Sequence, residues 1–567
     1  MAGPEPGKKF PVILPILPPM PHSPSLSTAW RSRAYLGVLT LVGVGLFFLR
    51  LGVPGLMDPD EGRYAEIARE MLLLKGWLIP HLNLAPYLEK PPLVYWLTSA
   101  SFAVFGQTEG AARLPAALAA LAGVFLAYGL GRSLWGERQG FWGAMVLATC
   151  GGYIILARIL TLDMVFAFFL NLSLALGYLA LSRERPRLWP WAYLALALAV
   201  LVKGPVALVL AGLIWGLTAV WRGGQALLAL VRPGAWVLLA GVVLPWFVYV
   251  AWRFPEFPRF FLWEHHLTRY VSGVSYHAEP WWYFGPVLLG LLLPWTFLVP
   301  WALGRRHLPA PGDRLFLLIW AGVILAFFSL SRGKLVPYIL PALLPLALLL
   351  GEGLAGVHSK EGGLRAAPGC RLSLALWALL AWLLVLLYFR PLGPLSSLLS
   401  EGDFLKPYPA LLLFLLALIP TIALLVGRLE ILLAGALLFG ALLPLGMEQL
   451  APKRSPRELG LALRDQWQPG AALVGVSYYS QGLSFYSGQA FHLLEFRTEL
   501  DFGNKLAPET GLVLKNLEEL QAFLDSRPLV FLYIKAKDLQ WLKRKLPREY
   551  ELLAQKNDGV LLAVRRK

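Results

Sequence analysis

Long apolar runs alternate with short polar connections along most of the chain, from about residue 34 to residue 447. Most of these runs are long enough for a helix to cross the ~30 Å hydrocarbon core of a bilayer. Basic residues gather in every second connection, as they do in loops that stay on the cytoplasmic side of a membrane. The pattern predicts about thirteen transmembrane helices. They are expected near 35–53, 114–133, 140–159, 164–181, 189–203, 205–221, 234–252, 283–303, 315–331, 336–352, 373–389, 408–426 and 430–447.

The two ends of the chain differ from this apolar part, 34–447. Residues 1–33 are rich in Pro and Ser, and the first apolar run after them lacks a small-residue cleavage site at its end. We therefore expect an uncleaved first span and a cytoplasmic N-terminal tail. An odd number of spans then places residues 448–567 on the external, periplasmic side, where dense charge and short periodic runs predict a small soluble α/β domain. Its expected helices are 457–466, 517–524 and 537–545, and its expected strands are 472–476, 529–534 and 559–564.

The first predicted external loop, 57–112, concentrates charge in a part of the chain that is otherwise poor in it. Apolar residues recur at helical spacing over 64–72, which predicts an amphipathic helix lying in the membrane interface. Asp58 is the expected N-cap of this helix, with Glu61 as its capping-box partner. The run 93–105 is short for a span and predicts a second interfacial helix. The polar face of the first helix is expected to be solvated and to pair its charges along the helix; it consists of Arg63, Glu66, Arg69 and Glu70.

Composition supports a polytopic membrane protein. The 567 residues are 57% hydrophobic and only 15% charged, with a mean hydropathy of +0.60, whereas soluble domains carry about 25% charged residues. The formal charge of +17 would suit a nucleic-acid partner. However, Lys and Arg lie in short clusters between apolar runs, so membrane orientation explains them and no nucleic-acid partner is expected. Cys150 falls in an apolar run and Cys370 in a loop, which suggests no disulfide framework.

A few ionisable residues stand at the predicted outer ends of spans, namely Asp163, Lys203 and Lys334. Charges at membrane depth are costly and usually face a polar cavity or a functional path. These residues and the external loop share one side of the membrane, so a single outward-facing cavity is expected to collect them. Cations there would suit a phosphate, and a carboxylate could take a proton from a bound hydroxyl. Glu89 with His265 or His266 could hold a divalent ion.

Each of these groups also has a structural interpretation. Asp58, Asp60 and Glu61 could act only as helix caps that complement the helix dipole. Lys203 and Lys334 could extend to the lipid headgroups, which the shorter Asp163 cannot do. Two adjacent histidines in the aromatic loop 252–282 are more often interface residues than metal ligands.

Seven motifs follow one another across the membrane region. They are PDEGRYAEIARE at 59–70, YLEKPPLVYW at 87–96, AARLPAAL at 111–118, LTLDM at 160–164, VKGP at 202–205, FLWEHHLTRY at 261–270 and KLVPYILP at 334–341. With these motifs in this order, the sequence resembles the aminoarabinose transferase and protein O-mannosyltransferase group, which are membrane glycosyltransferases of the GT-C fold.

The resemblance implies an inverting transfer of a hexose or pentose from a polyprenyl-phosphate carrier. The implied acceptor is a lipid A-like lipid or a protein at the outer face of the cytoplasmic membrane. Asp60 is the implied catalytic residue, and Asp163 matches a second acidic position. The implied substrate-binding residues are Arg63, Tyr64, Lys90, Lys203 and Tyr338, with Glu89 and His265 as the implied metal site.

The sequence departs from the aminoarabinose branch within EKPPLVYW and in having HH where a single His is typical. The acceptor and the metal ligand therefore stay open. Cations aimed at the leaving polyprenyl phosphate would stabilise charge that builds in the transition state, while Asp60 would take a proton from the acceptor or position it. No glycine-rich phosphate loop is seen, and no nucleotide cofactor is expected. A transporter or flippase for a lipid-linked sugar is the alternative, and it predicts a repeat symmetry that the sequence does not display.

Overall fold

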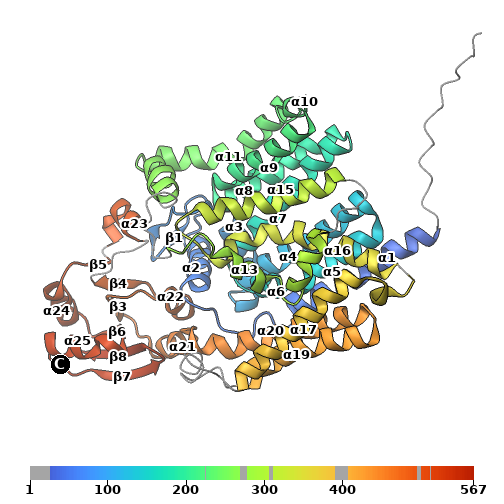
Figure 1. Cartoon of the computed structure of the whole chain (residues 1–567). Helices are drawn as coiled ribbons and strands as arrows, with labels where there is room; N and C mark the ends of the chain where they lie inside the picture. Colours follow the sequence, from blue (N-terminus) through green and yellow to red (C-terminus); the bar gives the residue numbers. More distant parts are fainter. Residues whose placement is uncertain are drawn as a thin grey trace, which may run out of the picture.

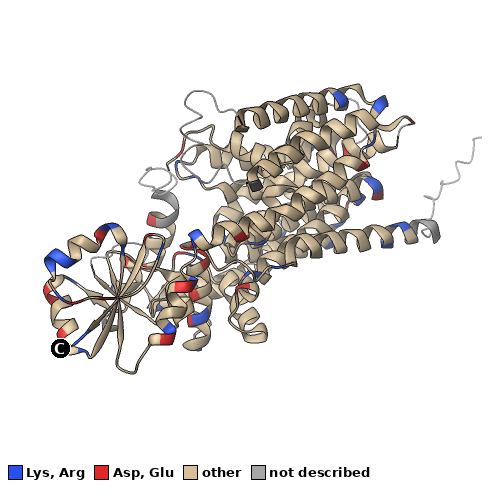
Figure 2. Ribbon diagram, turned by 90° about the horizontal axis from the view of Figure 1, so that it is seen from below, with Lys and Arg blue, Asp and Glu red and all other residues tan. Residues whose placement is uncertain are grey.

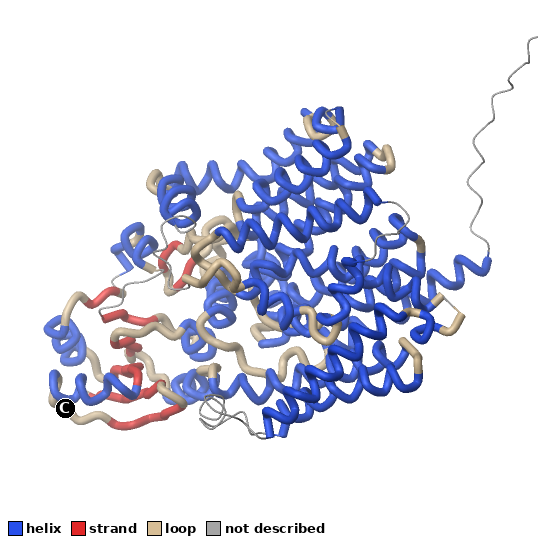
Figure 3. Tube along the Cα trace, viewed as in Figure 1, coloured by secondary structure: helices blue, strands red, loops and turns tan. Residues whose placement is uncertain are grey.

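The structure is a computed structural model that describes residues 26–223, 225–268, 278–304, 311–359, 361–389, 407–494, 500–510 and 512–566. A large helical region is followed by a C-terminal region that holds a sheet flanked by helices (Figures 1 and 3). The longer helices of the first region are α1 (Leu26–Gly43), α2 (Asp60–Leu73), α3 (Leu93–Phe105), α4 (Glu109–Trp135), α5 (Glu137–Thr149), α6 (Gly151–Ala157), α7 (Leu162–Ser182), α8 (Trp189–Lys203), α9 (Val206–Arg222), α11 (Pro233–Arg253), α13 (Phe284–Leu291), α14 (Val299–Gly304), α15 (Pro311–Leu330), α16 (Leu343–His358), α17 (Pro368–Phe389), α19 (Pro407–Val426) and α20 (Glu430–Leu450). The region also contains the π-helices η1 (Val44–Phe48) and η3 (Arg259–Thr268) and the 3₁₀-helices η4 (Thr296–Leu298) and η5 (Val336–Ala342).

Membrane spans can be recognised by helix length and composition. Within the described residues nine helices are long and apolar enough to cross a membrane, or up to eleven if each of two bent pairs counts as one span. The bent pairs are α5 with α6, at 65°, and α13 with the η4–α14 segment, at 111°. Each predicted span coincides with a helix or a bent pair, but α8 and α9 contain only 15 and 17 residues. The predicted count of thirteen is therefore not confirmed.

The break between α8 and α9 has a local cause. Gly204 adopts a φ of 78°, a conformation that glycine reaches without steric cost and that commonly ends a helix. Pro205 follows directly and precedes α9. The apolar run is therefore divided by a sharp turn, and Lys203 becomes the last residue of α8.

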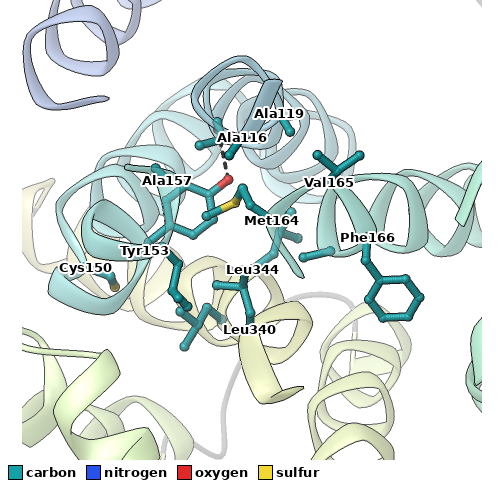
Figure 4. Packing of buried hydrophobic residues seen from close by; sticks show 14 of the residues in the cluster. Ala116, Ala119, Cys150, Tyr153, Ala157, Met164, Val165, Phe166, Leu340 and Leu344 are labelled. Carbon is teal, nitrogen blue, oxygen red and sulfur yellow. Dashed lines mark hydrogen bonds between the residues drawn. The ribbon is translucent and has the colours of Figure 1, made fainter. Parts of the chain in front are cut away.

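Small residues let the helices of this region pack closely, as is common for helices in membranes. A Cβ atom added to Gly351 of α16 would lie 2.1 Å from the backbone nitrogen of Gly143 in α5. Figure 4 shows alanines of α4 facing Tyr153 of α6 and residues of α7, with Leu340 and Leu344 on the other side of the cluster. The Tyr153 hydroxyl donates to the Ala120 carbonyl at 2.9 Å. This packing fixes the helix ends that carry the candidate site.

The C-terminal region contains a six-stranded mixed sheet in the order β5-β4-β3-β6-β8-β7. Neighbouring strands are parallel from β5 to β6, whereas β8 is antiparallel to both β6 and β7. Its strands are β3 (Ala472–Val476), β4 (Phe491–Leu494), β5 (Val513–Leu514), β6 (Leu529–Lys535), β7 (Glu551–Lys556) and β8 (Gly559–Arg565), and its helices include α21 (Arg457–Gln466), α22 (Gln481–Ser487), α23 (Asp501–Leu506), α24 (Leu517–Ser526) and α25 (Leu539–Lys545).

The predicted α/β character of this region is confirmed. The six expected elements correspond to α21, β3, α24, β6, α25 and β8. The sequence pattern did not predict β4, β5, β7, α22 and α23. Strand β5 has only two residues, too few for a periodic pattern, and the edge strand β7 is mostly exposed. The domain limits near residue 447 stay predictions.

Candidate active site

Charged residues are unevenly placed in the structure. Figure 2 shows few of them in the middle of the helical region, and more at its ends and where it meets the C-terminal region. At this meeting place helix α2 lies between α3 and α22 (Figure 1). The expected external helix thus exists, but α22 and α3 cover it, and it does not lie open on a surface.

The first turn of α2 carries the proposed catalytic residue. Asp60 is the first residue of the helix, and its side chain is 55% exposed. Arg63 Nη1 lies 3.7 Å from Asp60 Oδ1 and is largely buried. This places a reachable carboxylate beside a guanidinium that is held in position.

The predicted capping box is wrong. Pro59 occupies the N-cap position, with no side-chain cap, and the Asp58 carboxylate turns toward α22, where it accepts from Ser480 Oγ and Gly482 N–H. Glu61 Oε2 accepts from Met57 N–H, but its main partner is Arg113. Tertiary partners have replaced the local capping bonds.

Arg113 was not predicted as a functional residue. Its fully buried guanidinium donates to Glu61 Oε1 at 2.7 Å and to Glu61 Oε2 at 2.8 Å. It also donates to the carbonyls of Leu51, Pro54 and Gly55, at 3.0, 2.6 and 3.1 Å. One side chain therefore ties together the segment that leads into α2 and the helix itself. An arginine within an apolar helix is a signal that could have revealed this role.

The prediction that the polar face of α2 is solvated is also wrong. Glu66 and Glu70 are fully buried, and Arg69 is 8% exposed. Arg69 makes a two-pronged contact with Glu66, at 2.7 and 2.8 Å, and Glu70 accepts from Leu84 N–H at 2.9 Å. Burial, and then the charge of Glu66, raises the pKa of the Glu70 carboxyl well above its usual value. These charges hold α2 in place inside the protein.

A second group of predicted residues meets at the ends of three other elements. Asp163 lies in the first turn of α7, Lys203 ends α8 and Tyr338 belongs to η5. Lys203 Nζ lies 2.5 Å from Asp163 Oδ1, and it stands 4.3 Å from the centre of the Tyr338 ring. Both side chains of the ion pair are nearly buried, at 12% and 13% exposure. Lys203 is thus held by a carboxylate and an aromatic face, which argues against extension to the headgroups.

Lys334 serves another purpose. It is 3% exposed, and its ammonium donates to the carbonyls of Glu279 and Ser331, at 2.8 and 2.5 Å. Those bonds fasten the turn that follows α15 to the segment before α13. Lys334 therefore does not join the group around Lys203.

Tyrosines connect the two groups. The rings of Tyr64 and Tyr95 lie 5.9 Å apart, and those of Tyr87 and Tyr95 lie 6.4 Å apart. Burial raises the pKa of the Tyr64 phenol well above its usual value, and the charges of Asp60 and Asp163 raise it further. Both carboxylates therefore lie within electrostatic range of one phenol.

Glu89 lies at the edge of the same tyrosine group. The Tyr87 hydroxyl donates to Glu89 Oε2 at 3.2 Å. Burial, and then the Glu89 charge, raises the pKa of the Tyr87 phenol well above its usual value. Lys90 follows Glu89 in the chain and is partly buried.

The expected metal site of Glu89 with His265 or His266 stays a prediction. The side chains of His265 and His266 lie outside the described residues. No group of three His, Cys, Asp or Glu side chains suited to a metal ion occurs in the part of the chain that the structure describes.

Comparisons with known proteins find families and relatives that are similar to this chain. A family described as dolichyl-phosphate-mannose-protein mannosyltransferase matches residues 89–252, and the aminoarabinose transferase C-terminal domain matches residues 459–563. The chain is 38% identical over 375 residues to undecaprenyl phosphate-alpha-4-amino-4-deoxy-L-arabinose arabinosyl transferase 1 of Pseudomonas fluorescens, and the match covers 64% of this chain and 67% of that protein. A Pseudomonas aeruginosa relative with the same activity in its name is 38% identical over 338 residues, or 57% of this chain and 60% of the relative.

Solved structures give a wider match. The structure of ArnT from Cupriavidus metallidurans bound to undecaprenyl phosphate superposes with a TM-score of 0.82 and 25% identity, and the match covers 94% of this chain and 98% of that one. The archaeal oligosaccharyltransferase AglB of Archaeoglobus fulgidus matches with a TM-score of 0.51 and 13% identity, covering 91% of this chain and 70% of that one. The second likeness shows the fold alone.

Proposed function

We propose that this chain, which belongs to the aminoarabinose transferase family of GT-C membrane glycosyltransferases, moves a sugar from a polyprenyl-phosphate carrier to an acceptor at the outer face of the cytoplasmic membrane. Its relatives are named for a pentose, 4-amino-4-deoxy-L-arabinose, linked to undecaprenyl phosphate. We therefore place this chain among the pentosyltransferases, with a lipid A-like phosphate lipid as the acceptor.

One observation supports this proposal most directly. Lys203 Nζ is fixed between Asp163 and the Tyr338 ring, at 2.5 and 4.3 Å, within the site that Asp60 and Arg63 enter from α2. An ammonium has three N–H donors, and Asp163 takes one of them. The others remain suited to the oxygen atoms of a carrier phosphate.

The chemistry is a displacement at the anomeric carbon. An acceptor oxygen forms a bond to that carbon as the bond to the carrier phosphate oxygen breaks, and the electron pair leaves with the phosphate. Arg63, Lys90 and Lys203 supply the cations whose attraction grows with this charge, so they stabilise the transition state more than the bound donor. Asp60 takes the proton of a hydroxyl acceptor, or positions an acceptor that is already an anion.

A transfer assay tests this function. The purified full chain in lipid nanodiscs is given undecaprenyl phosphate carrying a labelled aminoarabinose, together with a lipid A-like acceptor or an unfolded protein acceptor. We expect label to move to the lipid and not to the protein. Transfer from undecaprenyl-phosphate hexoses alone would refute the pentose assignment, and transport of the donor without transfer would favour a flippase.

A further inference from the structure

The segment that leads into α2 is held by the C-terminal region. Leu56 N–H donates to the hydroxyl of Tyr486 at 2.7 Å. The Asp58 carboxylate accepts from Ser480 Oγ at 2.5 Å through one oxygen and from Gly482 N–H at 2.8 Å through the other. All three partners of this segment belong to α22 or to its N-cap, and Asp60 begins α2 only two residues after Asp58. The start of the catalytic helix is thus bound to an element more than four hundred residues away in sequence.

The start of α2 and the start of α22 are closely packed against each other. A Cβ atom at Gly62 would lie 2.1 Å from Asp58 Oδ1 and 2.5 Å from the backbone nitrogen of Gly482. A Cβ atom at Gly482 would in turn lie 2.6 Å from Asp58 Oδ1. At this contact α2 and α22 meet through backbone atoms and the hydrogen-bonded Asp58 carboxylate. These atoms cannot move aside as the end of a flexible side chain can. A displacement of α22 is therefore passed on to the first turn of α2.

We propose that Asp58 is a positioning residue through which α22 holds the Asp60 carboxylate in place for transfer. The inference rests on the proposed function and gives the C-terminal region a part in it. The Asp58 carboxylate bonds to α22 and its N-cap, and the Asp58 backbone N–H donates to the Arg454 carbonyl at 3.1 Å. Hydrogen bonds to a carboxylate are stronger than those between neutral groups, and a misplacement of ~1 Å in a reacting group can cost ~100-fold in rate.

Three substitutions test the role of Asp58. Asp58→Ala leaves the α22 donors without their acceptor, and we expect kcat for sugar transfer to fall by ~10–100-fold while KM for the donor and the midpoint of thermal unfolding change little. Asp58→Asn keeps an acceptor for Gly482 N–H and a donor for Ser480 Oγ, so most of the rate should return. Gly62→Ala pushes the helices apart while Asp58 keeps its carboxylate, and its kcat should fall as it does in Asp58→Ala.

Two variants serve as controls. Asp558→Asn changes a second carboxylate that lines the same hollow of about 330 Å³ as Asp58, and Gly76→Ala lies just past the other end of α2, where a Cβ atom meets nothing closer than 4.0 Å. Both should turn over like the unchanged protein.

The outcomes separate this inference from the proposed function. Absence of transfer by the unchanged protein would count against the proposed function. Normal kcat in a folded Asp58→Ala protein, or a loss shared by Asp558→Asn, would overturn the positioning role alone. If Asp58→Ala does not fold, Gly62→Ala and Asp58→Asn decide by the same criteria, and a normal kcat in Gly62→Ala overturns the inference.

Discussion

The first turn of α2 and the two turns after it differ in what surrounds their charges. Asp60 is 55% exposed and pairs loosely with Arg63, at 3.7 Å. Glu66 and Arg69, one turn on, are buried and bind each other at 2.7 Å. The difference teaches that charges on one helix stay accessible where no other element covers them and hold structure where other helices cover them. Side-chain type alone does not separate the two roles.

Substitution of the exposed carboxylate gives the largest expected effect. Asp60→Asn removes the carboxylate that we propose takes the proton or positions the acceptor, and such groups contribute ~10²–10⁴-fold to the rate. We expect transfer to fall by ~10³-fold, with unchanged thermal unfolding because the side chain is largely solvated. Single-turnover transfer in nanodiscs measures the rate. Normal turnover in a folded Asp60→Asn protein would remove Asp60 from the mechanism.

Loss of a buried charge should instead affect stability. Arg113→Ala leaves Glu61 buried without its partner, and breaking such a pair costs about 3–5 kcal/mol. The exposed pair of Arg132 with Glu137 is the matched control, since Arg132 is 50% exposed and its removal should cost under about 1 kcal/mol. Thermal or denaturant unfolding in detergent compares the two variants. Equal losses would contradict the contrast between covered and open charges.

Lys203 combines features of the two cases above, because its side chain is nearly buried, as that of Arg113 is buried, yet it is placed at the proposed site, as Asp60 is. Lys203→Met is expected to weaken binding of undecaprenyl phosphate by ~10-fold, about the contribution of one charge-assisted bond. Lys334→Met removes another buried lysine, whose ammonium donates to two backbone carbonyls, and should lower stability without changing this affinity. Binding is measured by titration of the labelled lipid into nanodiscs. Equal affinities in the two variants would leave Lys203 with a structural role only.

The smallest expected effect concerns pH. Burial raises the pKa of the Asp58 carboxyl to about 6, against the hydrogen bonds from Ser480 and Gly482 and the charge of Arg63, while Asp60 adds to the rise. The folded protein therefore holds this proton more tightly than the unfolded chain, whose Asp has a pKa near 3.8. Stability from this group is present at low pH and is lost as pH rises through about 6.

The matching variant makes this measurable. Asp58→Asn is neutral at every pH, so relative to the unchanged protein it should gain about 1–2 kcal/mol between pH 4 and pH 7, after allowance for partial exposure. Unfolding midpoints of the two proteins across this range give the difference. An opposite slope would show that Asp58 is better solvated than its surroundings imply.

Sequence alone determined the class of the protein and many of its candidate residues. Apolar run length is set by the thickness of a bilayer, so the helices could be placed before the structure, and the α/β pattern of the C-terminal region followed from local periodicity. The ordered motifs pointed to Asp60, Asp163 and Lys203. The pairing of Lys203 with Asp163, however, joins α8 to α7, and no local pattern encodes that contact.

Only the tertiary structure decided which charges are covered. Periodicity describes one helix at a time, and it assigned Glu66, Arg69 and Glu70 to water because nothing in α2 itself indicates that α22 lies against it. The same contact drew Asp58 away from its expected cap. Burial depends on what packs against a face, and here the packing element comes from the far end of the chain.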